Sequence, residues 1–265
     1  MKENNLREEN IKNIMNEKIG HRESTKEEIQ NREEFYKLFK EVPIPENEIL
    51  NNLGLFINRQ GWSRILFLHE LYKKIITVPG NIFEFGTRFG QIMAFYSSLR
   101  GIYEPFNWSR KIIGFDTFEG FPNEPNEKDG EHAATSKGSY ATGQNYEKIL
   151  EKILNFHESE SPISHIKKFE IIKGNIEKTL DEHLNKNPQT VIALAYIDFN
   201  LYEPTKYCLE KIKPYLTKGS VIAFDDFNHH VFPGETIAIS EILGLDKISI
   251  RRVPYQPWGA YTIIE

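Results

Sequence analysis

The sequence has little cysteine and no long apolar run, and both absences narrow the classes of protein that it can encode. Its 265 residues include one cysteine, Cys208, which excludes an internal disulfide and any metal site built from several cysteines. No segment approaches the roughly eighteen uninterrupted apolar residues that a membrane span needs. The N-terminal stretch MKENNLREEN also lacks the apolar core of a signal peptide. We therefore expect a cytoplasmic protein without a membrane partner.

Neither sign of charge dominates the chain. It carries 33 Lys and Arg residues against 38 Asp and Glu residues, which gives a net charge of -5. This balance makes no electrostatic case for binding nucleic acid or a membrane surface. With 39% hydrophobic residues, the chain is long enough for one sizeable core plus an appendage. We expect a globular protein that acts on a small molecule.

The first part of the chain is polar and reads as an appendage. Over residues 1–40 the apolar positions are sparse, as at Ile11, Ile14 and Met15, which predicts one or two exposed helices. Turn-forming residues at 51–54 then mark a boundary. We expect a helical extension over residues 1–60 and one globular domain over 61–265. Charged exposed helices also favour packing on a second subunit, so a homo-oligomer, a dimer or larger, is expected.

Short apolar runs and helical periodicity alternate through the second part of the chain. Helical segments separate apolar runs at 81–85, 111–115, 169–173, 191–197 and 220–224, and a closing hairpin is predicted at 247–253 and 260–264. Strands that alternate with helices form parallel sheets. The expected fold class is therefore α/β, Rossmann-like and doubly wound, with a mostly parallel seven-stranded sheet and helices on both faces.

Acidic residues stand where two neighbouring strands of this sheet end. Asp198 follows one apolar run, and Asp225 and Asp226 follow the next. Parallel strands end at the same edge of a sheet, where open α/β folds bind ligands. Three carboxylates there suit a hard cation such as Mg²⁺, Ca²⁺ or Mn²⁺. The alternative is that the residues from Asp225 to Asn228 form an ordinary turn.

Glycine follows the first strand, at a strand-to-helix turn. The segment EFGTRFG places Glu84 in the strand, Gly86 after it and Gly90 before the next helix. Such glycines let the backbone approach a ligand and leave the helix N-terminus free to receive it, although a purely structural turn has the same composition. Asp116 ends the next strand, near where nucleotide-binding folds place the acid that binds ribose hydroxyls.

A long polar segment without periodicity follows Asp116. Residues 122–146 are rich in Asn, Glu, Gly and Ser. Loops of this length inside a compact domain are usually lids or binding loops, and the alternative is a disordered segment without contacts. Because it leaves the same edge of the sheet, we expect it to be an active-site lid.

Several motifs, taken together, resemble one family. They are EFGTRFG at 84–90, GFDTFEGFP at 114–122, KGNIEKTL at 173–180, Asp198 followed by LYE at 201–203, and the pair Asp225 and Asp226. The chain from Ser63 to Glu265 resembles class I S-adenosylmethionine-dependent methyltransferases, and within them the macrocin O-methyltransferase family, which methylates sugar hydroxyls with the help of a divalent cation.

This resemblance implies roles for individual residues. Asp116 would hold the ribose, and the segment that begins at Gly174 would wrap the adenine. Asp198, Asp225 and Asp226 would bind Mg²⁺ or another hard divalent cation. The complete set of implied S-adenosylmethionine-binding residues is Glu84, Gly86, Thr87, Arg88, Gly90, Asp116, Thr117, Phe118, Gly174, Asn175, Ile176 and Asp198.

The resemblance implies an O-methyltransferase that acts on a sugar hydroxyl, with the sugar activated on a nucleotide or part of a glycan or natural product. The proton of that hydroxyl would pass to Asp198, His229 or His230. The sequence departs from the family pattern at Phe199-Asn200 and at His229-His230, beside the expected acceptor pocket, so the acceptor is open. The alternatives are a catechol-like phenolic acceptor, a NAD-binding protein and a non-catalytic protein of the same fold.

Overall fold

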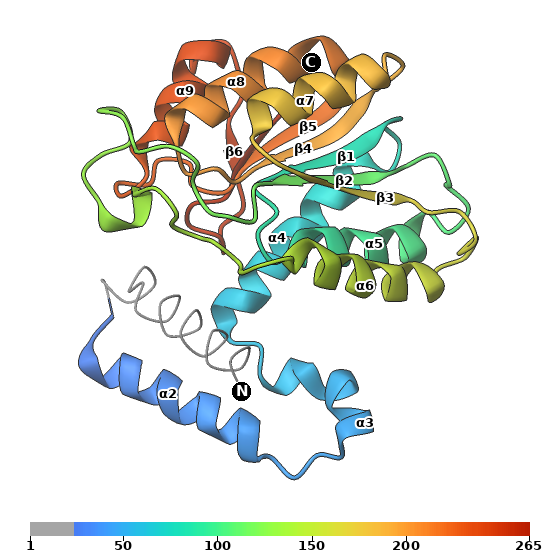
Figure 1. Ribbon diagram of the computed structural model, residues 1–265, viewed down its shortest axis with the longest axis vertical. Helices are drawn as coiled ribbons and strands as arrows, with labels where there is room; N and C mark the ends of the chain where they lie inside the picture. The colour runs from blue at the N-terminus through green and yellow to red at the C-terminus, as the bar shows by residue number, and fades with distance from the viewer. Residues whose placement is uncertain (1–23) are drawn as a thin grey trace. The chain divides into compact units, whose positions relative to one another are not determined.

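The computed structural model describes residues 24–265 and divides the chain into two compact units, Met1–Leu66 and Phe67–Glu265 (Figure 1). The predicted helical positions Ile11, Ile14 and Met15 lie outside the described residues.

The first unit contains short helical elements without a buried core of their own. Helix α2 (Lys26–Glu41) begins with a capping box, in which the hydroxyl of Thr25 accepts the Glu28 N–H at 3.2 Å and the Glu28 carboxylate accepts the Thr25 N–H at 2.8 Å. Helix α3 (Glu46–Ile49) and the 3₁₀ segment η2 (Leu50–Leu55) follow. These three elements bury none of their residues.

The larger unit is built on a seven-stranded sheet with the strand order β3-β2-β1-β4-β5-β7-β6. Strands β1 to β5 run parallel, and β7 pairs antiparallel with both β5 and β6. The order reverses between β1 and β4, which makes that position the topological switch point of the sheet. The strands are β1 (Asn81–Phe85), β2 (Ile112–Asp116), β3 (Phe169–Lys173), β4 (Ile192–Ile197), β5 (Leu216–Phe224), β6 (Arg251–Arg252) and β7 (Ala260–Ile263).

Helices cover both faces of the sheet, so its central strands are buried on two sides (Figure 1). The C-terminal part of α4 (Arg59–Ile75) packs on one face with α5 (Gln91–Tyr103) and α6 (Tyr146–Ser159). The other face carries α7 (Ile176–Lys186), α8 (Tyr202–Ile212) and α9 (Pro233–Leu243). In β4, Tyr196 faces the first layer and Ile197 the second, which explains the continuous apolar run. The predicted fold class is confirmed.

The closing hairpin forms, but its first strand is much shorter than predicted. Only Arg251 and Arg252 pair with β7, whereas Lys247 ends the turn that follows α9 and residues 248–250 form no strand. The N–H of Lys247 donates to the carbonyl of Gly244 at 2.9 Å, which closes that turn. The apolar residues there pack on the sheet without joining it, so apolar character alone predicted too long a strand.

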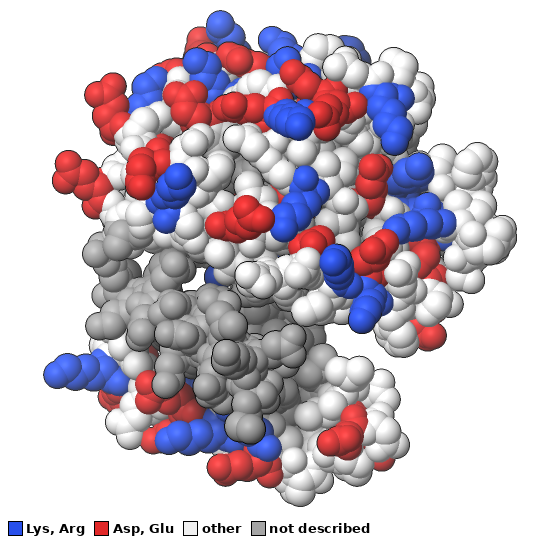
Figure 2. All heavy atoms as spheres, viewed as in Figure 1, with Lys and Arg blue, Asp and Glu red and all other residues white. Residues whose placement is uncertain are grey.

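The surface of the larger unit mixes charges of both signs. On the face drawn in Figure 2, Lys and Arg side chains alternate with Asp and Glu and gather into no stretch of one sign. Over the described part of the chain, every helix is too short or too polar to cross a bilayer.

Candidate active site

The glycine turn after β1 lies against the end of β4. Gly86 has a φ of +90°, and its N–H donates to the carbonyl of Phe115 at 3.0 Å. A Cβ at this position would lie 1.9 Å from the backbone oxygen of Asp198, so a larger residue cannot fit. The turn therefore brings the ends of β1, β2 and β4 into direct contact at the carboxyl edge of the sheet.

Asp116, at the end of β2, organises three turns at this edge. One carboxylate oxygen accepts the N–H of Arg88 at 2.7 Å and the other accepts the N–H of Phe118 at 2.6 Å. Its backbone carbonyl accepts the N–H of Gly174, after β3, at 2.9 Å. Burial raises the pKa of Asp116, and the two N–H donors act in the opposite direction. The acid that the sequence assigns to the ribose thus also connects the turns after β1, β2 and β3.

The other residues predicted in the glycine turn lie close by. Thr87 is buried, and the guanidinium carbon of Arg88 lies 4.9 Å and 4.8 Å from the ring centroids of Phe89 and Tyr140. Gly90 is the N-cap residue of α5 with a φ of +77°. Glu84 is buried in β1, directly before the turn. This turn leaves the N-terminus of α5 at the edge where Asp116 lies.

The remaining predicted cofactor residues follow β2 and β3. The Thr117 hydroxyl donates to the carbonyl of Gly120 at 2.6 Å, and the side chain of Phe118 is buried. Asn175 caps α7, because its side-chain oxygen accepts the N–H of Glu177 at 3.0 Å. Ile176 is the first residue of α7 and is buried. The structure therefore brings the predicted cofactor residues to one edge of the sheet.

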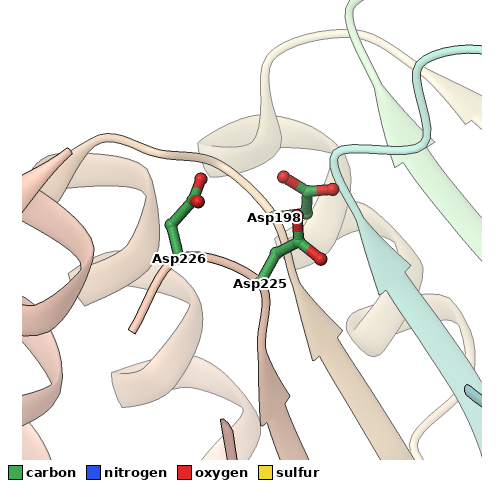
Figure 3. A group of neighbouring side chains, drawn as sticks. All are labelled: Asp198, Asp225 and Asp226. Atoms are coloured by element: carbon green, nitrogen blue, oxygen red, sulfur yellow. The ribbon is translucent and has the colours of Figure 1, made fainter. Parts of the chain in front are cut away.

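Three carboxylates gather beside the glycine turn. Asp198, Asp225 and Asp226 each offer one carboxylate oxygen, and these oxygens lie within 4.8 Å of one another. Figure 3 shows the three side chains at the ends of two neighbouring strands, with Asp198 and Asp225 side by side and Asp226 across from them. Parallel pairing of β4 with β5 produces this arrangement, since Ile197 pairs with Phe224 directly before the acids.

Three residues that the sequence analysis missed support these carboxylates. The hydroxyl of Tyr196 donates to Asp225, and the side-chain amide of Asn200 donates to Asp226. The carboxylate of Glu235, in the first turn of α9, accepts the backbone N–H of Asp226 at 3.2 Å. In the sequence, Tyr196 is one residue of an apolar strand. The available signal was that it is the one hydroxyl-bearing residue in β4.

The charge of this cluster fits a cation. Glu235 is fully buried, and its Oε2 has no hydrogen-bond partner among residues 24–265. Burial raises the pKa of Glu235 well above its usual range, and the charges of Asp226, Asp198 and Asp225 raise it further. The donor set consists of carboxylate oxygens, which suits Mg²⁺, Ca²⁺ or Mn²⁺ rather than zinc. The residues present therefore fit a hard divalent cation.

Aromatic side chains border the acidic cluster. The ring of His229 lies 5.2 Å from that of His230, 5.2 Å from that of Phe232 and 4.8 Å from that of Trp258, measured between centroids. Burial lowers the pKa of His229, and so do the charges of His230 and His132, whereas Asp225 raises it. Of the two histidines predicted to be catalytic, His229 is therefore half-buried and electrostatically coupled to Asp225, and His230 is exposed.

The predicted lid, residues 122–146, is attached to the start of α8 and to the last turn of α9. The carboxylate of Asp129 is buried and accepts the N–H groups of Tyr202 at 2.6 Å and of Asn126 at 2.9 Å. Lys128 forms an ion pair with Glu241 at 2.8 Å. The loop thus lies at the carboxyl edge of β4 and β5, as expected from its position after Asp116.

Comparison with known proteins identifies relatives of both the sequence and the structure. A model of a methyltransferase domain matches residues 83–227. The chain is similar to the crystal structure of CalS11, described as a calicheamicin methyltransferase, with 41% identity and a TM-score of 0.87 over 91% of this chain and 93% of that one. A structure of CalS11 without ligand is described as a TDP-rhamnose 3'-O-methyltransferase of calicheamicin biosynthesis. It is 39% identical, with a TM-score of 0.80 over 91% and 95% of the two chains.

A more distant structure shares the fold alone. The O-methyltransferase NovP is 18% identical, with a TM-score of 0.60 over 77% of this chain and 80% of that one. The search of curated protein sequences gave no match. Three observations indicate the same family. They are the match over residues 83–227, the identity to CalS11 and the glycine turn held by Asp116. The chain belongs to the methyltransferase-domain family and is an S-adenosylmethionine-dependent O-methyltransferase.

Proposed function

We propose that this enzyme transfers the methyl group of S-adenosylmethionine to a hydroxyl of a sugar carried on a nucleotide, with a divalent cation held by Asp198, Asp225 and Asp226. The observation that carries the proposal is the position of these carboxylates, which lie within 4.8 Å of one another while the backbone of Asp198 lies against the glycine turn at Gly86. The sugar nucleotide is proposed because the relative CalS11 is described as acting on TDP-rhamnose.

The residues at the carboxyl edge of the sheet would have separate roles in binding the cofactor and the cation. Asp116 and the turns that it connects would orient the cofactor, and the N-termini of α5 and α7 would lie beside it. S-adenosylmethionine supplies an activated methyl group, and alignment of the two reactants alone is worth about 7 to 11 kcal/mol. Asp198 would connect the two halves of the site, since its backbone contacts the glycine turn while its carboxylate belongs to the acidic cluster.

The acceptor must lose a proton during transfer. A divalent cation supplies Lewis acidity, which lowers the cost of removing a proton from the acceptor hydroxyl. Tyr196, Asn200 and Glu235 would hold the carboxylates in place around it. The proton would pass to one of the predicted groups Asp198, His229 and His230, and a positioned base contributes about 10² to 10⁴ in rate.

A phenolic acceptor is the second candidate, because aromatic rings border the acidic cluster. The rings of Phe232 and Trp258 both lie against the ring of His229, which interacts electrostatically with Asp225. Such a surface also suits a flat catechol-like molecule. The family assignment favours S-adenosylmethionine over NAD, so a NAD-dependent activity is not proposed.

The test measures methyl transfer to TDP-rhamnose and to catechol in parallel, with Mg²⁺ and with a chelator. We expect transfer to TDP-rhamnose that stops when the metal is removed. The variant Asp225→Ala should lose this transfer while it still binds S-adenosylhomocysteine in a calorimetric titration. Asp181→Ala is the matched control, because Asp181 pairs with Lys211 on the surface of α7 and α8.

Each part of the proposal has its own contrary outcome. Full activity of Asp225→Ala, or of the wild type in chelator, would exclude the metal. Transfer to catechol without transfer to TDP-rhamnose would replace the sugar by the phenolic acceptor. The sequence-based expectations of a homo-oligomer and of a cytoplasmic location remain predictions.

A further inference from the structure

His229 makes a hydrogen bond that determines which of its nitrogen atoms carries the proton. Its Nδ1 atom accepts the backbone N–H of Val231 at 3.1 Å. A nitrogen that accepts a hydrogen bond uses its lone pair and carries no hydrogen. In the neutral ring the hydrogen is therefore on Nε2, which becomes a donor and has no lone pair with which to take a proton.

Packing keeps the ring in this orientation. The ring of His230 stacks on that of His229 at 5.2 Å between centroids, with 5° between the planes. Phe232 and Trp258 lie at 5.2 Å and 4.8 Å on other sides. Rotation of the imidazole by 180° would place a carbon atom against the Val231 N–H and lose that hydrogen bond.

The surroundings also favour the neutral form of the ring. Burial, His230 and His132 lower the pKa of His229, and the Asp225 carboxylate is the opposing group. Within residues 24–265, no hydrogen bond is formed by the Nε2 atom of His229. The ring of His229 therefore offers an N–H donor without a protein partner, and the residue interacts electrostatically with Asp225 of the acidic cluster.

We propose that His229 donates a hydrogen bond from Nε2 to an oxygen atom of the acceptor and is not the group that removes the acceptor's proton. This inference rests on the proposed function, because it takes the acceptor to bind beside Asp225. The chemistry recognised is an oxygen with a free lone pair, on the sugar or on the phosphate of a sugar nucleotide. Of the predicted bases, Asp198 and His230 then remain.

The tautomer is tested without any substrate. In protein labelled with ¹⁵N-histidine, long-range proton–nitrogen NMR spectra distinguish a protonated Nε2 from a protonated Nδ1, and the signals of His229 are assigned by their loss in His229→Gln. We expect the hydrogen on Nε2. A hydrogen on Nδ1 would overturn the proposal, and this outcome is independent of whether the enzyme methylates a sugar.

Substitutions of His229 distinguish a hydrogen-bond donor from a base that removes the acceptor's proton. Glutamine offers an N–H near the position of Nε2 but is not a base, whereas asparagine offers only an oxygen near the position of Nδ1. With TDP-rhamnose we expect His229→Gln to keep kcat and KM within a few-fold of the wild type. His229→Asn and His229→Ala should raise KM by up to about tenfold, the value of one hydrogen bond of 1.4 kcal/mol. The affinity for S-adenosylhomocysteine should stay unchanged in all three variants.

The contrary result has a different pattern. If His229 were the base, all three variants would lose kcat by about 10² to 10⁴, and glutamine would not rescue. The acidic limb of the pH profile of kcat would then also disappear in the variants. Titration of TDP alone distinguishes the two oxygen sources: weaker binding of TDP to His229→Ala indicates a phosphate oxygen, and unchanged binding indicates a sugar oxygen.

Discussion

The hydroxyl of Tyr196, inside the buried strand β4, donates a hydrogen bond to the carboxylate of Asp225 at the end of β5. The two strands are neighbours, so the bond connects the core of the sheet to the acidic cluster at its edge. Partners of this kind orient a ligand side chain for its metal, and their loss typically costs 10- to 100-fold in metal affinity or activity.

Tyr196→Phe should therefore raise the Mg²⁺ concentration needed for half-maximal activity by about 10- to 100-fold. The change removes one hydroxyl and no apolar contact, so the fold should persist. Tyr207→Phe is the matched control, because the Tyr207 hydroxyl donates to the carbonyl of Glu177 at 2.6 Å, on a different surface. An unchanged Mg²⁺ requirement in Tyr196→Phe would show that Asp225 does not depend on this bond or does not bind the metal.

Asp116→Ala should weaken cofactor binding and also loosen the site. The substitution removes the acceptors of the Arg88 and Phe118 N–H groups, and each unsatisfied buried group costs about 1 to 3 kcal/mol. We expect the dissociation constant for S-adenosylhomocysteine to rise at least about tenfold, since tenfold corresponds to 1.4 kcal/mol. Calorimetric titration measures it, and Asp181→Ala serves as a surface control. Unchanged affinity would mean that Asp116 organises turns without contacting the cofactor.

Gly86→Ala and Gly138→Ala separate backbone strain from steric conflict. Both glycines have positive φ, +90° and +83°, but only at Gly86 does an added Cβ meet the backbone, 1.9 Å from the oxygen of Asp198. Gly138→Ala should lose about 1 to 2 kcal/mol of unfolding free energy from strain alone. Gly86→Ala should lose more than about 4 kcal/mol or bind no cofactor, as few single substitutions do. Similar losses in urea unfolding would contradict the close approach of β1 and β4.

The sequence predicted secondary structure and site residues best where a sequence pattern is compatible with only one local structure. The five parallel strands were located within a few residues, because each is an apolar run that ends at a turn. Parallel pairing then brings Asp198, Asp225 and Asp226 together without further information, as the structure has them. The helices on both faces were predicted from the same alternation, whereas the order of the strands comes from the structure.

The rest depends on contacts between residues far apart in the chain. Tyr196 looked like one more buried residue of β4, and only the position of β5 gives its hydroxyl a partner. In the sequence, Glu235 has only the features of a residue at a helix start. In the structure, α9 packs so that the Glu235 carboxylate is buried and accepts the N–H of Asp226. The residues 247–250 are apolar enough for a strand, yet the turn at Gly244 keeps them out of the sheet.

His183 should make the stability of the protein depend on pH. It is buried on α7 against the rings of Phe83 and Phe115, and burial lowers its pKa below the ordinary value of 6.5. The unfolded chain takes up this proton near pH 6.5, whereas the folded protein takes it up only at lower pH. The unfolding free energy should therefore fall as pH drops below 6.5, by at most about 1.4 kcal/mol per pH unit from this residue. Urea unfolding between pH 7.5 and 5 should show a flatter dependence for His183→Gln; equal slopes would contradict the assignment.

Asp129→Ala should release the predicted lid from the start of α8. The buried carboxylate accepts the Tyr202 N–H at the start of α8, and loss of such a cap costs about 0.5 to 2 kcal/mol. Because the same carboxylate also holds Asn126 within the loop, the acceptor should bind more weakly while cofactor affinity changes little. Steady-state kinetics give KM for TDP-rhamnose, and hydrogen exchange should show faster exchange at the amides of Asn126 and Tyr202. Glu131→Ala is the control, an exposed acid of the same loop. A loss of stability with unchanged KM would make Asp129 a packing residue and remove the argument that this loop contacts the acceptor.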